Sequence, residues 1–169
     1  MIEIYNKIYI GNEQDYYSII DKKEWAILHC CKNPFHCNFV GYRGSLPSSH
    51  PNYALKRIDN EMALNLVDMD RFSVNYLDFN RRMFEEAFEF LDEYRITGHK
   101  ILIHCNQGES RGPTVGMLYA ARLGAFDYSN FEASVENLKT IYPIYNPKNN
   151  IYMTVASLWD YFVKESEEI

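Results

Sequence analysis

The chain has 169 residues, a formal net charge of −6 and 47% hydrophobic residues. This length and apolar content predict a single domain, residues 1–169, built around one hydrophobic core. The negative charge, with no compensating basic patch, argues against a nucleic-acid partner or an anionic membrane surface. No apolar stretch approaches the length of a membrane span, and no signal-peptide pattern follows Met1, so no membrane association is expected.

The first part of the chain is predicted to alternate strands with helical or irregular segments. Residues 4–10 have the pattern of a strand, and residues 14–20 that of a short helix. A second strand is predicted over residues 25–30. Residues 32–61 contain three prolines and two glycines, which predict mostly loop. The next strand is predicted over residues 63–67.

The second part is predicted to be mainly helical. Apolar residues at helical spacing predict a helix over residues 78–95, followed by a buried strand at 101–104. Further helices are predicted over residues 114–123, 130–141 and 150–164. Strands that alternate with helices, followed by a run of helices, indicate an α/β fold with helices packed on a sheet.

The most informative stretch of the sequence begins where the predicted strand at 101–104 ends. Cys105 follows the strand directly, and Arg111 comes six residues later, at the start of a helical pattern. A strand, a tight loop and a helix N-terminus form an anion cradle, because loop N–H groups converge and the helix dipole points at the same place. This field favours thiolate over thiol, and an arginine can grip a tetrahedral oxyanion with two parallel hydrogen bonds. The stretch therefore predicts phosphoryl transfer through a cysteinyl-phosphate.

A lone cysteine at the end of a strand is usually only a small buried residue, so the surrounding residues decide the interpretation. His104 precedes the cysteine, Gly108 allows a tight turn in mid-loop, and Pro113 suits the first turn of a helix. These features favour the catalytic interpretation. The residues predicted to surround the bound phosphate are Asn106, Gln107, Gly108, Glu109, Ser110 and Arg111.

The order His-Cys, five residues, Arg resembles the signature of the Cys-based protein phosphatases, and the chain is similar in size to their dual-specificity branch. Residues 7–12 resemble the first strand and turn of that family, and residues 64–68 resemble the strand that delivers its general acid. Residues 142–149 resemble its Pro-and-Asn segment more loosely, and residues 32–61 match no pattern. The resemblance implies a central mixed sheet with helices packed on it, no cofactor, and a supporting role for His104.

A phosphatase of this kind needs a proton donor for the leaving oxygen, and three acids lie upstream of the cysteine. Asp68 is the preferred donor because it ends the strand predicted over 63–67, and the resemblance favours the same position. Asp70 is the alternative, since a turn of loop could bring it into the site. Asp78 suits the first turn of the next helix, where a carboxylate interacts favourably with the dipole. Asn149 is the residue that the resemblance places behind the loop.

Two residues depart from the pattern of the family. Glu109 puts a carboxylate beside the phosphate cradle, which disfavours polyanionic substrates such as phosphoinositides by Coulomb repulsion. Gly112 stands where the family usually has a serine or threonine, whose hydroxyl stabilises the departing thiolate. The departing thiolate is therefore expected to lack one hydrogen-bond donor, with Ser110, Thr114 or a water as the alternative sources of it.

A cluster of possible metal ligands lies near the second predicted strand: His29, Cys30, Cys31, His36 and Cys37. It lacks the paired Cys-x-x-Cys knuckles of structural zinc sites, and Cys30 and Cys31 point to opposite faces of a strand. No metal site is therefore expected here. Residues 32–61 are expected to fold over the pocket instead, with Arg43 as a cation that contacts the substrate.

Together these observations predict a cofactor-free protein phosphatase that hydrolyses phosphotyrosine, with phosphoserine and phosphothreonine as further substrates, through phospho-Cys105. Its expected partner is a phosphorylated protein. Four cysteines, one of them needed as a thiolate, favour a reducing compartment and hence the cytoplasm. The alternatives are a weakly active module that binds phosphopeptides, an RNA 5′-triphosphatase on the same loop, and a rhodanese-like sulfur transferase or phosphatase.

Overall fold

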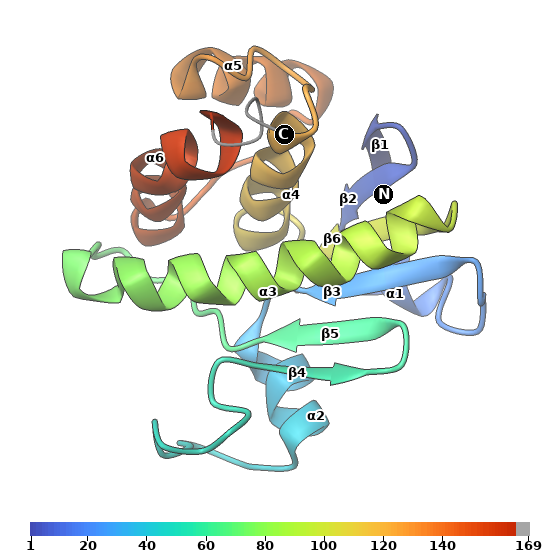
Figure 1. Ribbon diagram of the computed structural model, residues 1–169, viewed down its shortest axis with the longest axis vertical. Coiled ribbons are helices and arrows are strands. Elements are labelled where there is room, and N and C mark those ends of the chain that lie inside the picture. Colours follow the sequence, from blue (N-terminus) through green and yellow to red (C-terminus); the bar gives the residue numbers. More distant parts are fainter. Residues whose placement is uncertain (165–169) are drawn as a thin grey trace.

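The computed structural model describes residues 1–164 as one six-stranded mixed sheet with helices on both faces (Figure 1). The strands are β1 (Ile2–Tyr5), β2 (Ile8–Gly11), β3 (Trp25–His29), β4 (Leu55–Ile58), β5 (Glu61–Leu64) and β6 (Lys100–His104), in the spatial order β1-β2-β6-β3-β5-β4. The α-helices are α1 (Glu13–Tyr17), α2 (Cys37–Val40), α3 (Leu77–Ile96), α4 (Arg111–Arg122), α5 (Phe131–Ile141) and α6 (Asn149–Lys164). A π-helical turn, η1 (Lys32–His36), and a 3₁₀ turn, η2 (Val74–Tyr76), complete the described elements. This architecture confirms the predicted α/β fold.

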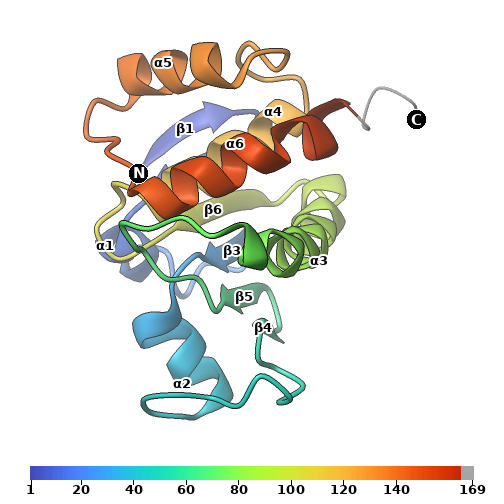
Figure 2. The same ribbon diagram turned by 90° about the vertical axis from the view of Figure 1, so that its left-hand side faces the viewer.

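The inner four strands are parallel, and an antiparallel strand closes each edge of the sheet. Parallel strands are covered on both faces and are therefore apolar throughout; all five residues of β3 are buried. α3 and α4 pack on one face of the sheet, α6 packs on α4, and α1 contacts the opposite face (Figure 2). The carboxyl ends of β3 and β6 lie side by side, with His29 paired to His104.

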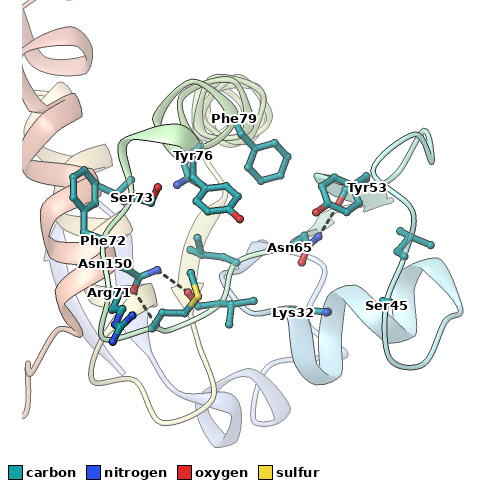
Figure 3. Close-up of a pocket in the computed structure, with 16 residues that line it drawn as sticks. Lys32, Ser45, Tyr53, Asn65, Arg71, Phe72, Ser73, Tyr76, Phe79 and Asn150 are labelled. Carbon is teal, nitrogen blue, oxygen red and sulfur yellow. Dashed lines mark hydrogen bonds between the residues drawn. The ribbon is translucent and has the colours of Figure 1, made fainter.

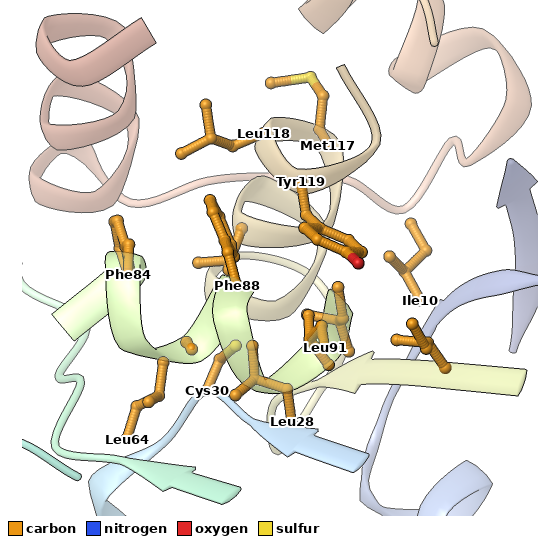
Figure 4. Packing of buried hydrophobic residues seen from close by; sticks show 14 of the residues in the cluster. Ile10, Leu28, Cys30, Leu64, Phe84, Phe88, Leu91, Met117, Leu118 and Tyr119 are labelled. Atoms are coloured by element: carbon orange, nitrogen blue, oxygen red, sulfur yellow. The ribbon is translucent and has the colours of Figure 1, made fainter. Parts of the chain in front are cut away.

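The hydrophobic core lies mainly between the sheet and the pair α3 and α4 (Figure 4). Phe84 and Phe88 of α3 stack in parallel with their ring centroids 6.1 Å apart, and Phe88 contacts the ring of Tyr119 in α4. Leu28 of β3 lies on the sheet side of this cluster. Since α4 is buried from Gly112 to Ala121, the helix that follows Cys105 is fixed on all sides.

The prediction of one strand over residues 4–10 is wrong, because the segment folds as the hairpin of β1 and β2. Asn6 and Lys7 form its turn with φ values of 33° and 66°. Two central residues with positive φ are typical of the turns whose twist suits a two-residue hairpin, and asparagine tolerates this conformation well. Apolar residues stand directly before and after this two-residue turn, so the sequence pattern did not reveal the break between the two strands.

The prediction that residues 32–61 are mostly loop is wrong for a large part of that segment, which contains η1, α2 and β4. Pro34 lies within η1, and the other prolines and the two glycines that suggested a loop lie in the connection between α2 and β4. The strand predicted over 63–67 is shifted: β5 ends at Leu64, and residues 65–70 are irregular. The four long helices from α3 to α6 agree with their predictions to within three residues at each end. None of the helices among residues 1–164 combines the length and apolarity needed to cross a bilayer.

Candidate active site

The loop after β6 turns sharply around Gly108 and leads into α4. Gly108 has a φ of 73°, and a Cβ at this position would lie 2.9 Å from the backbone carbonyl of Gly11 and 3.0 Å from the hydroxyl of Tyr142. Only glycine fits both the positive φ and this close approach. The main chain at the other side of the loop is held by a hydrogen bond from the N–H of Asn146 to the carbonyl of Glu109 (2.8 Å). The loop is therefore fixed from both sides.

The N-terminus of α4 has no side-chain cap. Ser110 occupies the N-cap position, where a hydroxyl normally accepts a hydrogen bond from the first helical turn. Its hydroxyl instead donates to Asp68 Oδ1 (2.8 Å) and accepts from the N–H of Lys148 (3.0 Å). The first N–H groups of α4 are thus left without the cap that would compete with an anion for them.

Arg111 is held beside this helix end in a fixed orientation. Its Nη1 donates to the carbonyl of Leu66 (3.1 Å) and its Nη2 to Asn106 Oδ1 (3.3 Å). Its Nε lies 3.3 Å from Asp68 Oδ2, but the angle is not that of a hydrogen bond, and this buried donor has no hydrogen-bond partner among residues 1–164. A guanidinium with one buried, unpaired N–H is suited to an oxyanion ligand.

Cys105, Asp68 and Arg111 line one cavity of about 380 Å³. The other residues that line it are Asn106, Gln107, Glu109, Ser110, Asn146 and Lys148. The predicted site residues are therefore brought together, except that Gly108, which packs against Gly11 and Tyr142, and the buried His104 do not line the cavity. Glu109 is also among the residues that line the cavity.

The three acids considered as proton donors are in different surroundings. Asp68 is the one that lines the cavity and contacts the residues of the loop. The side chain of Asp70 is 86% exposed and lies 3.4 Å from the ammonium of Lys148. Asp78 pairs with Arg81 and Arg82 in the first turn of α3, and its bond with Arg81 lowers the pKa of its carboxyl. Of the three acids, Asp68 is therefore the one that lines the cavity with Cys105 and Arg111.

Asn150, which the sequence did not single out, fixes the segment that carries Asp68. Its Nδ2 donates to the carbonyl of Val67 (3.0 Å), and its Oδ1 accepts from the N–H of Met69 (3.0 Å). Asn149, the residue expected behind the loop, is exposed instead. The two asparagines are adjacent, and no signal in the sequence distinguishes them. Arg43, expected to contact the substrate, is exposed and does not line this cavity.

The other three cysteines differ chemically from Cys105 in their surroundings. Burial raises the pKa of the Cys30 thiol well above its ordinary value and that of Cys31 to about 12. The thiol of Cys37 donates to Asn33 Oδ1 at 3.0 Å. His36 is bonded to Tyr42 and to a backbone carbonyl. Within residues 1–164, no group of three or more His, Cys, Asp or Glu side chains is arranged to hold a metal ion.

Gly112 packs directly against the backbone beneath the cysteine. A Cβ at this position would lie 2.7 Å from the carbonyl carbon of His104 and 2.8 Å from the N of Cys105. Neither of the two hydroxyls named as alternative donors donates to the sulfur. That of Ser110 donates to Asp68, and that of Thr114 donates to the carbonyl of Ser110 (2.7 Å).

We expect Gly112→Ser to destabilise the protein, because the new Cβ would meet backbone atoms that cannot rotate away. The expected cost is about 1–3 kcal/mol, the usual range for overpacking. Thermal unfolding followed by circular dichroism measures it. Ala133→Ser in the first turn of α5 is a matched control that adds a hydroxyl at a partly exposed helical position. A Gly112→Ser protein as stable as this control would show that the backbone below the cysteine has room for a side chain.

A second cavity of about 270 Å³ lies beside the segment that carries Asp68 (Figure 3). Val67 and Met69, the neighbours of Asp68, both line it. Its walls include the aromatic rings of Tyr53, Phe72, Tyr76 and Phe79, and its cations are Lys32 and Arg71. None of the residues that line it is acidic, although the chain carries a net charge of −6.

No protein-family model matches the chain. Among curated proteins, dual specificity protein phosphatase 5 of Rattus norvegicus is 44% identical over 43 residues, and that of Homo sapiens is 43% identical over 51 residues. These matches cover 25% and 27% of this chain but only 11% and 13% of the two relatives. The chain therefore matches about a tenth of the length of these relatives.

Solved structures match nearly the whole chain. DUSP15 is similar with a TM-score of 0.63 and 17% identity over 99% of this chain and 95% of that one. A human tyrosine phosphatase-like serine/threonine/tyrosine-interacting protein is similar with a TM-score of 0.63 and 16% identity over 95% of each chain. The chain thus has a dual-specificity phosphatase-like fold.

Proposed function

We propose that the protein is a cysteine-dependent protein phosphatase that hydrolyses phosphotyrosine, and phosphoserine and phosphothreonine as well, through phospho-Cys105. One observation carries the proposal. A single cavity holds a cysteine at an uncapped helix N-terminus, an arginine with an unpaired buried N–H, and a carboxylate. The cysteine is the nucleophile, the arginine and the helix N-terminus form the oxyanion site, and the carboxylate is the proton donor. Together these groups suffice for phosphoryl transfer. On this proposal, residues 1–169 form one catalytic domain.

In the first step, the Cys105 thiolate attacks the phosphorus, an S–P bond forms, and the P–O bond to the leaving group breaks. The three phosphoryl oxygens lie against the N–H groups of residues 106–111 and the guanidinium of Arg111, whose free Nε supplies one donor. Asp68, protonated at this stage, gives its proton to the leaving oxygen. His104 supports the loop from behind and takes no part in proton transfer.

In the second step, water attacks phospho-Cys105, the S–P bond breaks, and inorganic phosphate leaves. Asp68, now a carboxylate, accepts a proton from the attacking water and regains its initial state. The hydroxyls of Ser110 and Thr114 donate elsewhere, so the departing thiolate relies on the helix N-terminus for stabilisation. We infer that this step is the slower one and that phospho-Cys105 accumulates.

A protein is the substrate class that the second cavity favours. Exposed apolar side chains gather along the segment around Asp68, including Val67, Met69, Val74 and Tyr76. Exposed apolar surface beside a catalytic cavity is typical of sites that bind a protein segment. Because the cavity is cationic, it favours a segment with acidic side chains near the phosphorylated residue. The four free cysteines are consistent with a cytoplasmic location.

We expect Arg71→Glu to lower kcat/KM about tenfold for phosphopeptides with acidic flanking residues, because it reverses a charge on the cavity wall. The rate on a small aryl phosphate, which fills only the first cavity, should stay unchanged. Steady-state kinetics on both substrates measures the effect. Lys139→Glu, on α5 outside both cavities, is the control for net charge. Equal effects of the two variants on the peptide would refute selection by this cavity.

A phosphopeptide-binding module of low activity is the second candidate. Gly112 favours it, because no side chain at that position can assist the departing thiolate. One of the similar structures is itself named a phosphatase-like interacting protein. In this case the loop binds the phosphoryl group, but phospho-Cys105 is hydrolysed slowly.

The experiment that tests the proposed function is a turnover screen with phosphotyrosine and phosphoserine peptides, 5′-triphosphate RNA, and thiosulfate with cyanide. We expect phosphate release from the peptides, with phosphotyrosine fastest. Tight binding of the peptides with fewer than one turnover would support the binding module. Turnover of RNA or thiosulfate alone would contradict the proposal.

A further inference from the structure

A chain of buried side chains connects the backbone of the nucleophile to a carboxylate on a neighbouring strand. His104 Nδ1 lies 3.2 Å from the carbonyl oxygen of Cys105, and His104 Nε2 lies 2.6 Å from His29 Nδ1. His29 Nε2 lies 2.8 Å from Glu61 Oε2, which also accepts a hydrogen bond from the Tyr16 hydroxyl (3.0 Å). Both imidazoles are fully buried, and the side chain of Glu61 is 18% exposed.

With Glu61 ionised, these contacts require three protons on the two imidazoles. A carbonyl oxygen and an ionised carboxylate oxygen can only accept, so each of the three contacts in series needs its own ring proton. Two neutral imidazoles carry only two ring protons. With two, one contact would bring lone pairs face to face, and the 2.6 Å separation between His29 and His104 requires a proton between them. A third proton gives one imidazolium shared by the pair, which the Glu61 carboxylate neutralises.

We propose that His29, His104 and Glu61 form a proton-holding relay, in which one extra proton, retained by Glu61, places a positive charge beneath Cys105 and stabilises its thiolate. His29 and Glu61 are thus positioning residues for the nucleophile. The role of the charge rests on the proposed function, whereas the proton count does not.

The surroundings of the relay explain why Glu61 matters. Burial lowers the pKa of both imidazoles, and for His104 the neighbouring His29 lowers the pKa further. The bond to Glu61 and its charge act in the opposite direction on His29. Tyr16 and Phe35 pack against both imidazoles and Phe39 against His29, and the one titratable group among these rings, Tyr16, has its pKa raised by burial and stays neutral. The extra proton therefore depends on the carboxylate.

The positive charge of the relay is present at low pH and lost at high pH. The relay binds its third proton at the lower pH values and releases it as pH rises, because burial shifts the imidazole titration downward. At the lower pH values, the positive charge beneath Cys105 favours its thiolate over the protonated thiol. The relay thus extends the reactivity of Cys105 toward acid pH.

The decisive variant is Glu61→Gln, which keeps the shape of the side chain but removes its charge. The amide can donate an N–H to His29 Nε2, and in that orientation two neutral imidazoles satisfy all three contacts. The rate of alkylation of Cys105 by iodoacetamide, read by mass analysis of its peptide, reports thiolate without requiring turnover. At pH 5.5–6 we expect this rate to be about tenfold lower in Glu61→Gln than in wild type, because a thiol that loses the nearby charge holds its proton more tightly. At high pH the two rates should be equal.

Tyr16→Phe is the matched control, because it removes a hydrogen bond from the same oxygen of Glu61 but leaves the charge and the ring protons. Its alkylation profile should follow that of wild type. Nitrogen-15 NMR of the imidazoles counts the protons directly. We expect three ring N–H groups on His29 and His104 at pH 5.5 in wild type and two in Glu61→Gln. Two in wild type, or a Glu61→Gln profile like that of wild type, would overturn the proposal. Either result would leave the phosphatase assignment to the turnover screen.

Discussion

Cys105→Ser should reduce turnover below detection while phosphate-analogue binding persists. The serine hydroxyl is not ionised near neutral pH, so no phosphoryl-enzyme forms at a useful rate, and the expected loss is at least about 10⁴-fold. The oxyanion cradle consists of loop N–H groups and Arg111, which the substitution leaves in place. Steady-state hydrolysis of an aryl phosphate and calorimetric binding of tungstate measure the two properties separately.

Arg111→Lys is the matched comparison for this experiment and should lose both properties. A lysine ammonium cannot reproduce the fixed contacts of the guanidinium to Leu66 and Asn106, nor present an N–H to the ligand in the same geometry. Hydrolysis by purified Cys105→Ser, or equal tungstate binding by Arg111→Lys, would be incompatible with the proposed roles.

Asp68→Asn should lower the rate on phosphotyrosine and phosphoserine peptides by a factor of about 10²–10⁴, the usual contribution of a positioned acid. The amide retains an oxygen that can accept from the Ser110 hydroxyl, so the loop should keep its shape. The loss should shrink on aryl phosphates with acidic phenols, because these leaving groups depart without a proton. Kinetics on a series of aryl phosphates of increasing phenol acidity measures this dependence.

Asp70→Asn is the control for the acid assignment, since Asp70 is exposed and lies outside the cavity. We expect its rates to equal those of wild type across the whole series. If Asp70→Asn were sensitive to the leaving group and Asp68→Asn were not, the two acids would have to exchange roles.

The sequence predicted the parts of the site that depend on local order. Cys105, the turn at Gly108 and Arg111 lie within one short stretch between a buried strand and a helix, so their neighbours in sequence are also their neighbours in space. The place of Asp68 in the cavity could be predicted because the residue comes shortly after the apolar strand β5, although the strand ends at Leu64. The long helices were predictable for a similar reason, since their apolar faces repeat over several turns.

The parts that were missed depend on contacts between distant segments. Asn150 fixes the Asp68 segment across more than 80 residues of sequence, and nothing near it in the chain indicates this. In the sequence, His29 stands out only as part of a cluster of possible metal ligands. In the structure its contacts are His104 and Glu61, which only strand pairing brings together. The second cavity depends on residues 32–61, where prolines and glycines concealed short elements. These features follow from tertiary packing, which overrides local pattern.

The central claim, a phosphoryl group carried on Cys105, can be tested by rapid mixing of the protein with an activated aryl phosphate, acid quenching within the first turnover, and mass analysis of the peptide that contains Cys105. Because the hydroxyls of Ser110 and Thr114 donate elsewhere and Gly112 has none, we predict a burst of phenol close to one equivalent per protein and a phosphoryl group on Cys105 that persists through the steady state. Steady release of phosphate with Cys105 unmodified at every time, or with the phosphoryl group on another residue, would contradict the account.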